Sequence, residues 1–404
     1  MNPGDTAWVF MSIALVFLMT PGLAFFYGGL ASTRDAVNTM KMCFCALALI
    51  SVEWALLGYS FSFSEGNILS GGLGFFALKG VGIEPHPDYG QTIPHYSFMM
   101  FQMMFAVITP ALISGAIVGR MRFRAYMIFI SIWPIFVHNP ICLWVWGPGG
   151  WIEELGALDF AGGTVVHINA GVSALVAAKM VGPRPLSEQE SPHNVPFVIL
   201  GASLLWFGWM GFNGGSSLAA DGIGGLALVT TNLSAAAAVL VWFALELLTK
   251  QKTTAVGASI AAVIGLVGIT PSAGFVSPMS AMAIGAISSW VCYISLMLIG
   301  KTRIDDTLDV FACHGVGGII GALLTGVFAS VAVNPGGADG ILFGGWELMK
   351  AQAISVVATI IYSAIATAII MYLMKSMMEI RADTDVGMDL AEHGEAAYDF
   401  NPKN

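Results

Sequence analysis

The chain has 404 residues, of which 56% are apolar and 10% are charged, and its net charge is −9. Soluble proteins carry roughly a quarter charged residues, so this composition excludes an ordinary soluble domain and is typical of a membrane protein. The negative charge, without any basic patch, also excludes a nucleic-acid-binding protein.

Eleven apolar segments follow one another along the chain. A bilayer is crossed by about 20 apolar residues, and the backbone of each crossing must satisfy its own hydrogen bonds, so we expect an all-α polytopic membrane protein. The expected spans are Ala7–Tyr27, Val37–Phe61, Tyr96–Val118, Ala125–Val145, Gly162–Met180, Val195–Asn213, Leu226–Leu248, Ala255–Ile269, Ser280–Gly300, Leu308–Ser330 and Ala351–Met378. They form a membrane domain, residues 1–380, which a C-terminal tail, residues 381–404, follows.

The lysines and arginines predict the orientation of these spans. With the N-terminus outside, only Lys79 and Lys350 of the 16 basic residues fall on the outer side. Because basic residues are enriched in cytoplasmic loops, this distribution favours an outer N-terminus and a cytoplasmic tail. The residues on the inner side are Arg34, Lys41, Arg120, Arg122, Arg124, Lys179, Arg184, Lys250, Lys252, Lys301, Arg303, Lys375, Arg381 and Lys403.

The first ten spans divide into two sets of five, residues about 6–180 and 195–330, before an eleventh helix at about 351–378. An odd number of spans gives the two sets opposite topology, so we expect an inverted repeat. The last span of each set contains a histidine, His167 or His314, eight residues after an aspartate, Asp159 or Asp306. Eight residues of helix rise about 12 Å, which places both histidines near the middle of a core about 30 Å thick.

An ionisable side chain at this depth is costly and points to function. A neutral imidazole offers one donor and one acceptor, so His167 and His314 together fit a narrow polar pore. Two structural histidines bonded to backbone carbonyls are the alternative. Haem ligation is disfavoured because no arginine lies within a span to balance the propionates, and zinc needs more ligands than two histidines. The five cysteines show no metal-type spacing, so we expect buried thiols and neither a cofactor nor a metal.

Other ionisable residues have weaker functional signals. Glu53 lies inside the second span, where we expect it to be neutral or paired, and no partner is evident from the sequence. For the remaining histidines we expect structural or solvated roles; they are His86, His95, His138, His193 and His393.

Six long motifs resemble those of the ammonium transporter (Amt) family, the relatives of the Rhesus proteins. They are DTAWVFMSIALVFLMTPGLAFFYGG, DFAGGTVVHINAG, PHNVPFVILGASLLWFGWMGFNGGS, ITPSAGFV, DVFACHGVGG and MDLAEHGEAAY, and they extend in order from Asp5 to Tyr398. The resemblance implies a transporter and not an enzyme. It also implies eleven helices in an inverted repeat, a homotrimer and one pore in each protomer, in the cell's inner (plasma) membrane.

The resemblance assigns roles to individual residues. His167 and His314 match the paired pore histidines, and Phe105 and Phe212 match the two phenylalanines that gate the pore from outside. The outer ammonium site is matched by Phe105 together with Trp146, Ser216 and Asp159. The implied mechanism is capture of ammonium at this site, loss of a proton near the gate, and passage of ammonia along the histidines.

Three aspects stay open at this point. In relatives, PII-type signalling proteins bind at the inner face and read the tail. Two inner loops of this chain depart from the family pattern: only Arg34 stands where the family has a basic cluster after the first span, and Val118-Gly119-Arg120 stands where it has Ala-Glu-Arg. These departures put control by a PII-type protein in doubt. The retained MDLAEHGEAAY motif favours an ordered tail. An ammonium sensor with little flux and a Rhesus-like neutral gas channel remain alternatives to transport.

Overall fold

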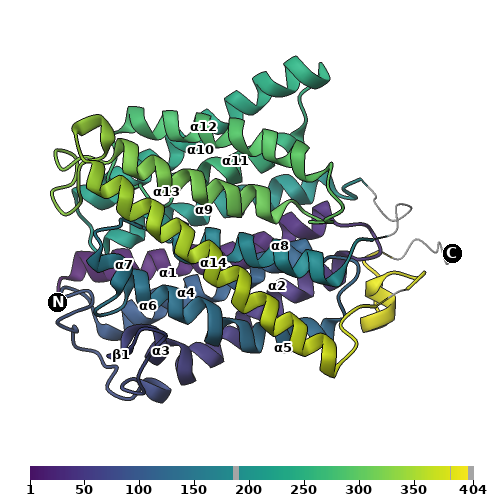
Figure 1. Cartoon of the computed structure of the whole chain (residues 1–404), viewed down its shortest axis with the longest axis horizontal. Coiled ribbons are helices and arrows are strands. Elements are labelled where there is room, and N and C mark those ends of the chain that lie inside the picture. Colours follow the sequence, from purple (N-terminus) through teal and green to yellow (C-terminus); the bar gives the residue numbers. More distant parts are fainter. Residues whose placement is uncertain (185–190, 383, 399–404) are drawn as a thin grey trace.

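The computed structural model describes residues 1–184, 191–382 and 384–398, and in these ranges nearly all regular structure is helical. Long helices run side by side along the longest axis of the molecule (Figure 1). The α-helices are α1 (Pro3–Leu30), α2 (Ala36–Glu53), α3 (Tyr59–Phe63), α4 (His95–Ile113), α5 (Phe123–Trp133), α6 (Asn139–Trp146), α7 (Trp151–Glu154), α8 (Asn169–Val181), α9 (Val195–Gly214), α10 (Gly222–Lys250), α11 (Ala255–Ile269), α12 (Pro278–Ile299), α13 (Gly317–Phe328) and α14 (Trp346–Met377).

Shorter elements connect or extend these helices. The π-helical turns are η1 (Trp54–Gly58), η4 (Pro134–His138), η5 (Gly163–Ile168), η8 (Phe311–Val316) and η10 (Asp389–His393), and the 3-10 turns are η2 (Phe76–Leu78), η3 (Ser114–Ala116), η7 (Gly215–Ser217) and η9 (Ile341–Phe343). One departure from the all-α expectation is an antiparallel hairpin of two-residue strands, β1 (Gly66–Asn67) and β2 (Ser70–Gly71), in the loop after α3.

Ten helical segments of the described residues are long and apolar enough to cross a membrane, and they coincide with ten of the expected spans. The eighth expected span is α11, whose 15 residues rise only about 22 Å, less than the hydrocarbon core. Most of α11 is buried among neighbouring helices, and a helix surrounded by protein need not match the bilayer thickness. The count of eleven crossings therefore remains a prediction.

Glycines near His167 and His314 allow close approach between neighbouring segments. A Cβ on Gly171 of α8 would lie 2.1 Å from the backbone nitrogen of Gly315 in η8. A Cβ on Gly163 would lie 2.7 Å from the ring of Pro271. Small residues in membrane helices allow backbones to approach in this way. The apolar, glycine-rich run around His167 is thus a site of tight helix crossing.

One end of the molecule gathers basic residues from several loops and the C-terminal tail. Arg122 forms an ion pair with Glu379 at 2.6 Å, and Arg184 pairs with Asp305 at 2.8 Å. The Asp389 carboxylate in the tail accepts hydrogen bonds from the first residues of α2, Val37 and Asn38.

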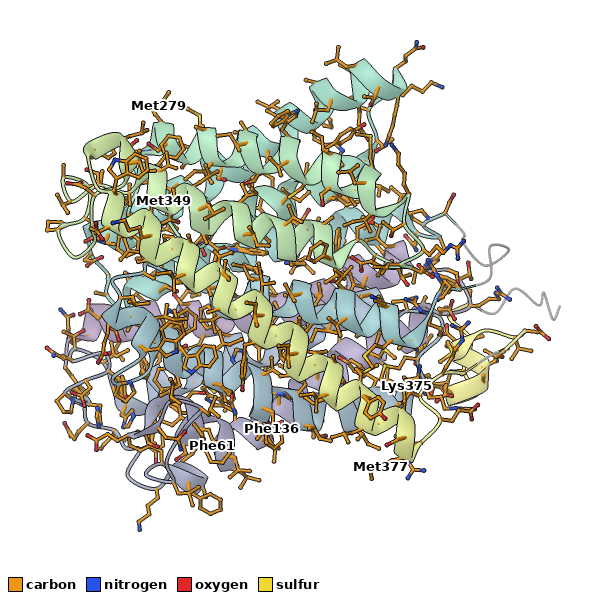
Figure 2. All side chains as sticks on the ribbon, viewed as in Figure 1. Phe61, Phe136, Met279, Met349, Lys375 and Met377 are labelled. Carbon is orange, nitrogen blue, oxygen red and sulfur yellow. The ribbon has the colours of Figure 1, made fainter. Side chains whose placement is uncertain are left out.

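Figure 1 places the N-terminus at the opposite end from the yellow tail segment. In Figure 2, Lys375 and Met377 lie at the tail end of α14 and Met349 lies near its other end. Lys403, one of the inner basic residues expected from the sequence, lies outside the described residues.

Candidate functional site

Four residues expected at the outer site line a vestibule of about 290 Å³. They come from separate elements: Phe105 from α4, Trp146 from the last residue of α6, Asp159 from the loop before η5, and Ser216 from η7. The fold therefore brings together side chains that the sequence assigns to one site only through the family resemblance.

Two phenylalanine rings close the bottom of this vestibule. The ring centroids of Phe105 and Phe212 lie 4.4 Å apart, and both side chains are almost completely buried. The ring of Trp146 meets Phe105 edge-on, with centroids 5.7 Å apart. The Ser216 hydroxyl donates its proton to the Phe212 carbonyl at 2.7 Å, so its lone pairs remain available to accept a hydrogen bond from a ligand.

Asp159 organises the start of the helix that carries His167. Its two carboxylate oxygens accept hydrogen bonds from four successive backbone N–H groups, those of residues 162–165, at 2.6–3.2 Å. Burial raises the pKa of the Asp159 carboxyl, and the four N–H groups oppose this shift. The Asp159 carbonyl accepts a hydrogen bond from the Trp146 indole at 2.9 Å, which fixes the ring at the edge of the vestibule. Asp159 therefore acts on the vestibule through the backbone and through Trp146.

His167 and His314 meet below the phenylalanines. Their Nδ1 atoms lie 3.2 Å apart, a hydrogen bond in which one ring donates and the other accepts. Both rings are buried, and together with apolar side chains they line a cavity of about 10 Å³, close to the space that a single water-sized molecule needs. The fold thus brings into contact two histidine rings that lie 147 residues apart in the sequence.

The model of the Ammonium Transporter Family matches residues 7–398. The chain belongs to the ammonium transporter family. It is 46% identical to an ammonium transporter of Bacillus subtilis over 402 residues, which cover 98% of this chain and 99% of the relative.

Solved structures of the same family superimpose closely on this chain. The Candida albicans Mep2 structure has a TM-score of 0.89 at 34% identity and covers 95% of this chain and 87% of its own. A structure described as a sensor Amt protein has a TM-score of 0.87 at 31% identity and covers 96% and 98%.

Sequence reasoning missed Trp209 in this family member. The His167 ring stacks beside both Trp209 and Phe212, with centroid distances of 5.4 and 5.9 Å, and those two rings lie 5.3 Å from each other. His167 also faces His314, at 5.3 Å. The Trp209 indole donates to the Thr270 hydroxyl at 2.9 Å, which holds the indole in place. The spacing contains a signal, because residues three apart on a helix share a face and Trp209 lies three before Phe212.

A continuous column of rings runs from Trp146 through Phe105, Phe212 and His167 to His314.

The aspartate expected before the second histidine lies at the opposite mouth. Asp306 lines an opening of about 500 Å³ together with Asp305 and Asp309. Its carboxylate accepts a hydrogen bond from the Phe311 N–H at 2.7 Å, at the start of η8, as Asp159 does at η5. Burial raises the pKa of Asp306 to about 6, and the backbone hydrogen bonds oppose this rise.

Other ionisable residues remain outside the column of rings. A buried carboxylate oxygen of Glu53 has no hydrogen-bond partner among the described residues. His95 bonds the Tyr59 hydroxyl, His193 contacts the Ala31 carbonyl at 3.0 Å, and His393 contacts Asn38 in α2 at 2.9 Å. His138 is buried in η4 and His86 stacks on Tyr89. No group of three metal-ligating side chains occurs in the part of the chain that the structure describes.

Proposed function

We propose that this protein transports ammonium and ammonia across the inner (plasma) membrane of the cell and catalyses no chemical conversion of a substrate. The single observation that carries the proposal is the column of rings from Trp146 to His314, with a cation-accepting vestibule at one end and a one-molecule cavity below. The curated relatives at 41–46% identity, named ammonium transporters, support ammonium as the substrate.

Capture takes place in the vestibule. A small cation over the faces of Trp146 and Phe105 gains about 0.5–2 kcal/mol of cation–π attraction, depending on how far it is desolvated. Ser216 accepts one of its N–H groups, since the hydroxyl proton already points to the Phe212 carbonyl. The negative charge of Asp159 acts through the backbone it binds and through the position of Trp146.

Ammonium gives its proton to water in the vestibule, beside the phenylalanine gate. The space below Phe212 is lined almost entirely by apolar side chains and admits one small molecule, so a cation there would lose its hydration without replacement. That loss costs far more than the vestibule contacts return. Ammonia is neutral and exchanges hydrogen bonds with the His167 and His314 rings as it passes. A current in the test below would show that the proton also crosses the membrane, and a luminal pH change without current would show that it returns to the outer side.

The assembly that we propose is a homotrimer of eleven-helix protomers, each an inverted repeat with its own pore, the N-terminus outside and the C-terminus inside. The gathering of basic residues at the tail end supports this orientation. The matching capping roles of Asp159 and Asp306 before the two histidines support the repeat. A PII-type protein is the candidate regulator at the inner face, where the tail covers the start of α2.

Two alternative functions use the same site. The match to a sensor Amt structure favours an ammonium sensor that binds ammonium with little flux. A Rhesus-like channel for neutral gas requires no cation site. The contact of Trp146 and Phe105 beside Ser216 favours a cation-capturing mouth over a neutral-gas channel. Transport ranks above sensing because the relative at 46% identity is named an ammonium transporter, whereas the sensor Amt structure is 31% identical.

The test is ammonium-triggered current and luminal pH change in proteoliposomes, with His167→Asp and His314→Ala beside the wild type and His86→Ala as a control outside the column of rings. We expect transport by the wild type and the control, and altered flux or ion selectivity in both pore variants. Ammonium binding without either signal would show a sensor, and ammonia flux without ammonium capture would show a gas channel. Wild-type behaviour of both pore variants would remove the histidines from the mechanism.

A further inference from the structure

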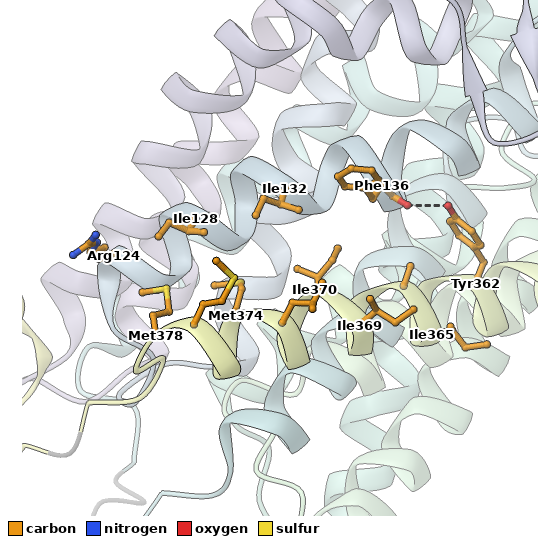
Figure 3. A pocket seen from close by; sticks show the side chains of 13 residues that line it. Arg124, Ile128, Ile132, Phe136, Tyr362, Ile365, Ile369, Ile370, Met374 and Met378 are labelled. Atoms are coloured by element: carbon orange, nitrogen blue, oxygen red, sulfur yellow. Dashed lines mark hydrogen bonds between the residues drawn. The ribbon is translucent and has the colours of Figure 1, made fainter.

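A groove of about 860 Å³ runs along the surface of the molecule between α5 and α14 (Figure 3), and none of its lining residues belongs to the column of rings. One wall comes from α5 and η4 and the other from α14. Its lining is apolar except for Arg124 and the hydroxyl of Tyr362; it consists of Arg124, Ile128, Ile132, Phe136, Tyr362, Ile365, Ala366, Ile369, Ile370, Leu373, Met374, Met377 and Met378.

The length of the groove matches one leaflet of a bilayer. Arg124 and Phe136 mark its two ends on one wall, and 12 residues of helix between them rise about 18 Å, compared with about 15 Å for half of the hydrocarbon core. At the Phe136 end, the Tyr362 hydroxyl donates to the Phe136 carbonyl at 2.9 Å, and this bond bridges the two walls (Figure 3). An acyl chain that enters beside Arg124 therefore ends near the middle of the membrane.

The walls of the groove expose large apolar surfaces: Phe136, Ile369 and Leu373 are each more than half exposed. Flexible hydrocarbon chains fit both the volume and the chemistry of such a groove.

The end of the groove at Arg124 is positively charged. The neighbouring Arg122 pairs with Glu379 and Glu392, whereas exposed Arg124 has no acidic partner among the described residues. The lining contains no aspartate or glutamate. Arg124 lies at the end where the basic loops and the tail gather, the predicted cytoplasmic side. A guanidinium at this level is matched to a phosphate group, which it can bind through two parallel N–H donors.

We propose that this groove binds an anionic glycerophospholipid of the cytoplasmic leaflet. The lipid phosphate contacts the Arg124 guanidinium, and an acyl chain lies along Ile128, Ile132 and Ile369 towards the Tyr362–Phe136 bond. The net negative headgroup is selected because a zwitterionic lipid carries its own ammonium near the phosphate, which offsets the attraction to Arg124.

The experiment titrates detergent-purified protein with dioleoyl phosphatidylglycerol or dioleoyl phosphatidylcholine and counts bound lipids by native mass spectrometry. Wild-type protein should bind the first phosphatidylglycerol about fivefold more tightly than phosphatidylcholine, the ratio expected for one basic residue at a membrane surface. Arg124→Gln should abolish this preference and leave phosphatidylcholine binding unchanged. Ile369→Trp, which fills the groove, should weaken the first site for both lipids.

Two matched substitutions serve as controls. Lys252→Gln removes an exposed positive charge from the loop after α10, and Ile361→Trp enlarges an exposed α14 side chain outside the groove. Both should bind lipid as the wild type does. The proposal is overturned if Arg124→Gln keeps the phosphatidylglycerol preference, or if Ile361→Trp weakens binding as much as Ile369→Trp. It is equally overturned if Ile369→Trp changes the number of subunits, because the groove would then be an interface between copies of the chain.

Discussion

Replacing Asp159 by asparagine should break part of the hydrogen bonding that holds the first turn of the His167 helix in place beside the vestibule. The carboxylate accepts four backbone N–H groups, two on each oxygen. An asparagine keeps one acceptor oxygen and turns an NH2 group towards the other two donors. Each buried donor left without a partner costs about 1–3 kcal/mol, so the substitution should cost about 2–6 kcal/mol.

The same change should impair transport. The displaced turn carries His167, and the Trp146 indole depends on the Asp159 carbonyl for its position. A loss of only 1.4 kcal/mol at the site corresponds to a factor of ten, so we expect the transport rate, read as current or luminal pH change, to fall at least about tenfold.

Melting temperature in detergent and current in proteoliposomes measure the two effects. Asp221→Asn is the matched control, because Asp221 caps α10 with one oxygen bonded to the Gly224 N–H, and asparagine caps helices equally well. We expect Asp159→Asn to melt several degrees below both the wild type and the control. If Asp159→Asn melts with the control and carries wild-type current, the carboxylate does not organise the site as argued.

Three further results are expected. Trp146→Leu should raise the half-saturating ammonium concentration of the current by about two- to thirtyfold, because 0.5–2 kcal/mol of cation–π attraction is lost; an unchanged value would contradict this. Gly171→Ala should cost about 1–3 kcal/mol or more and reduce flux, because the new Cβ meets the Gly315 backbone, while Gly225→Ala, with open space around it, should be neutral in both measurements. Asp309 lies outside the helix that begins at η8, and burial and nearby carboxylates raise its pKa to about 7. Because the folded pKa is raised, ionisation of this carboxyl destabilises the folded protein progressively as pH rises from about 4 to about 7. Asp309→Asn removes the charge, so it should raise the melting temperature at pH 8 and not at pH 4. An equal gain at both pH values would refute this reasoning.

Residue spacing and family resemblance each predicted a different part of the column of rings. The sequence identified His167 and His314 through their equal spacing from aspartates, because helix rise converts residue number directly into depth. It found no comparable signal for Phe105 and Phe212, which only the family resemblance singled out. Their contact depends on how α4 and α9 each pack against α1, and no local pattern encodes that contact. Trp209 was missed for a different reason: a tryptophan in an apolar helix is ordinarily a packing residue, and its spacing of three from Phe212 indicates a shared face only once Phe212 is placed in the site.

Local properties of the chain determined the spans and the predicted orientation. The length of each apolar run and the position of each basic residue belong to single segments, so ten of the expected spans match helices of the structure. The tertiary structure alone decided which side chains meet: the two imidazoles, the four N–H groups on Asp159, and the two walls of the groove beside Arg124. These contacts join segments that are far apart in sequence, and their geometry is set by helix crossings that depend on the packing of all the helices at once.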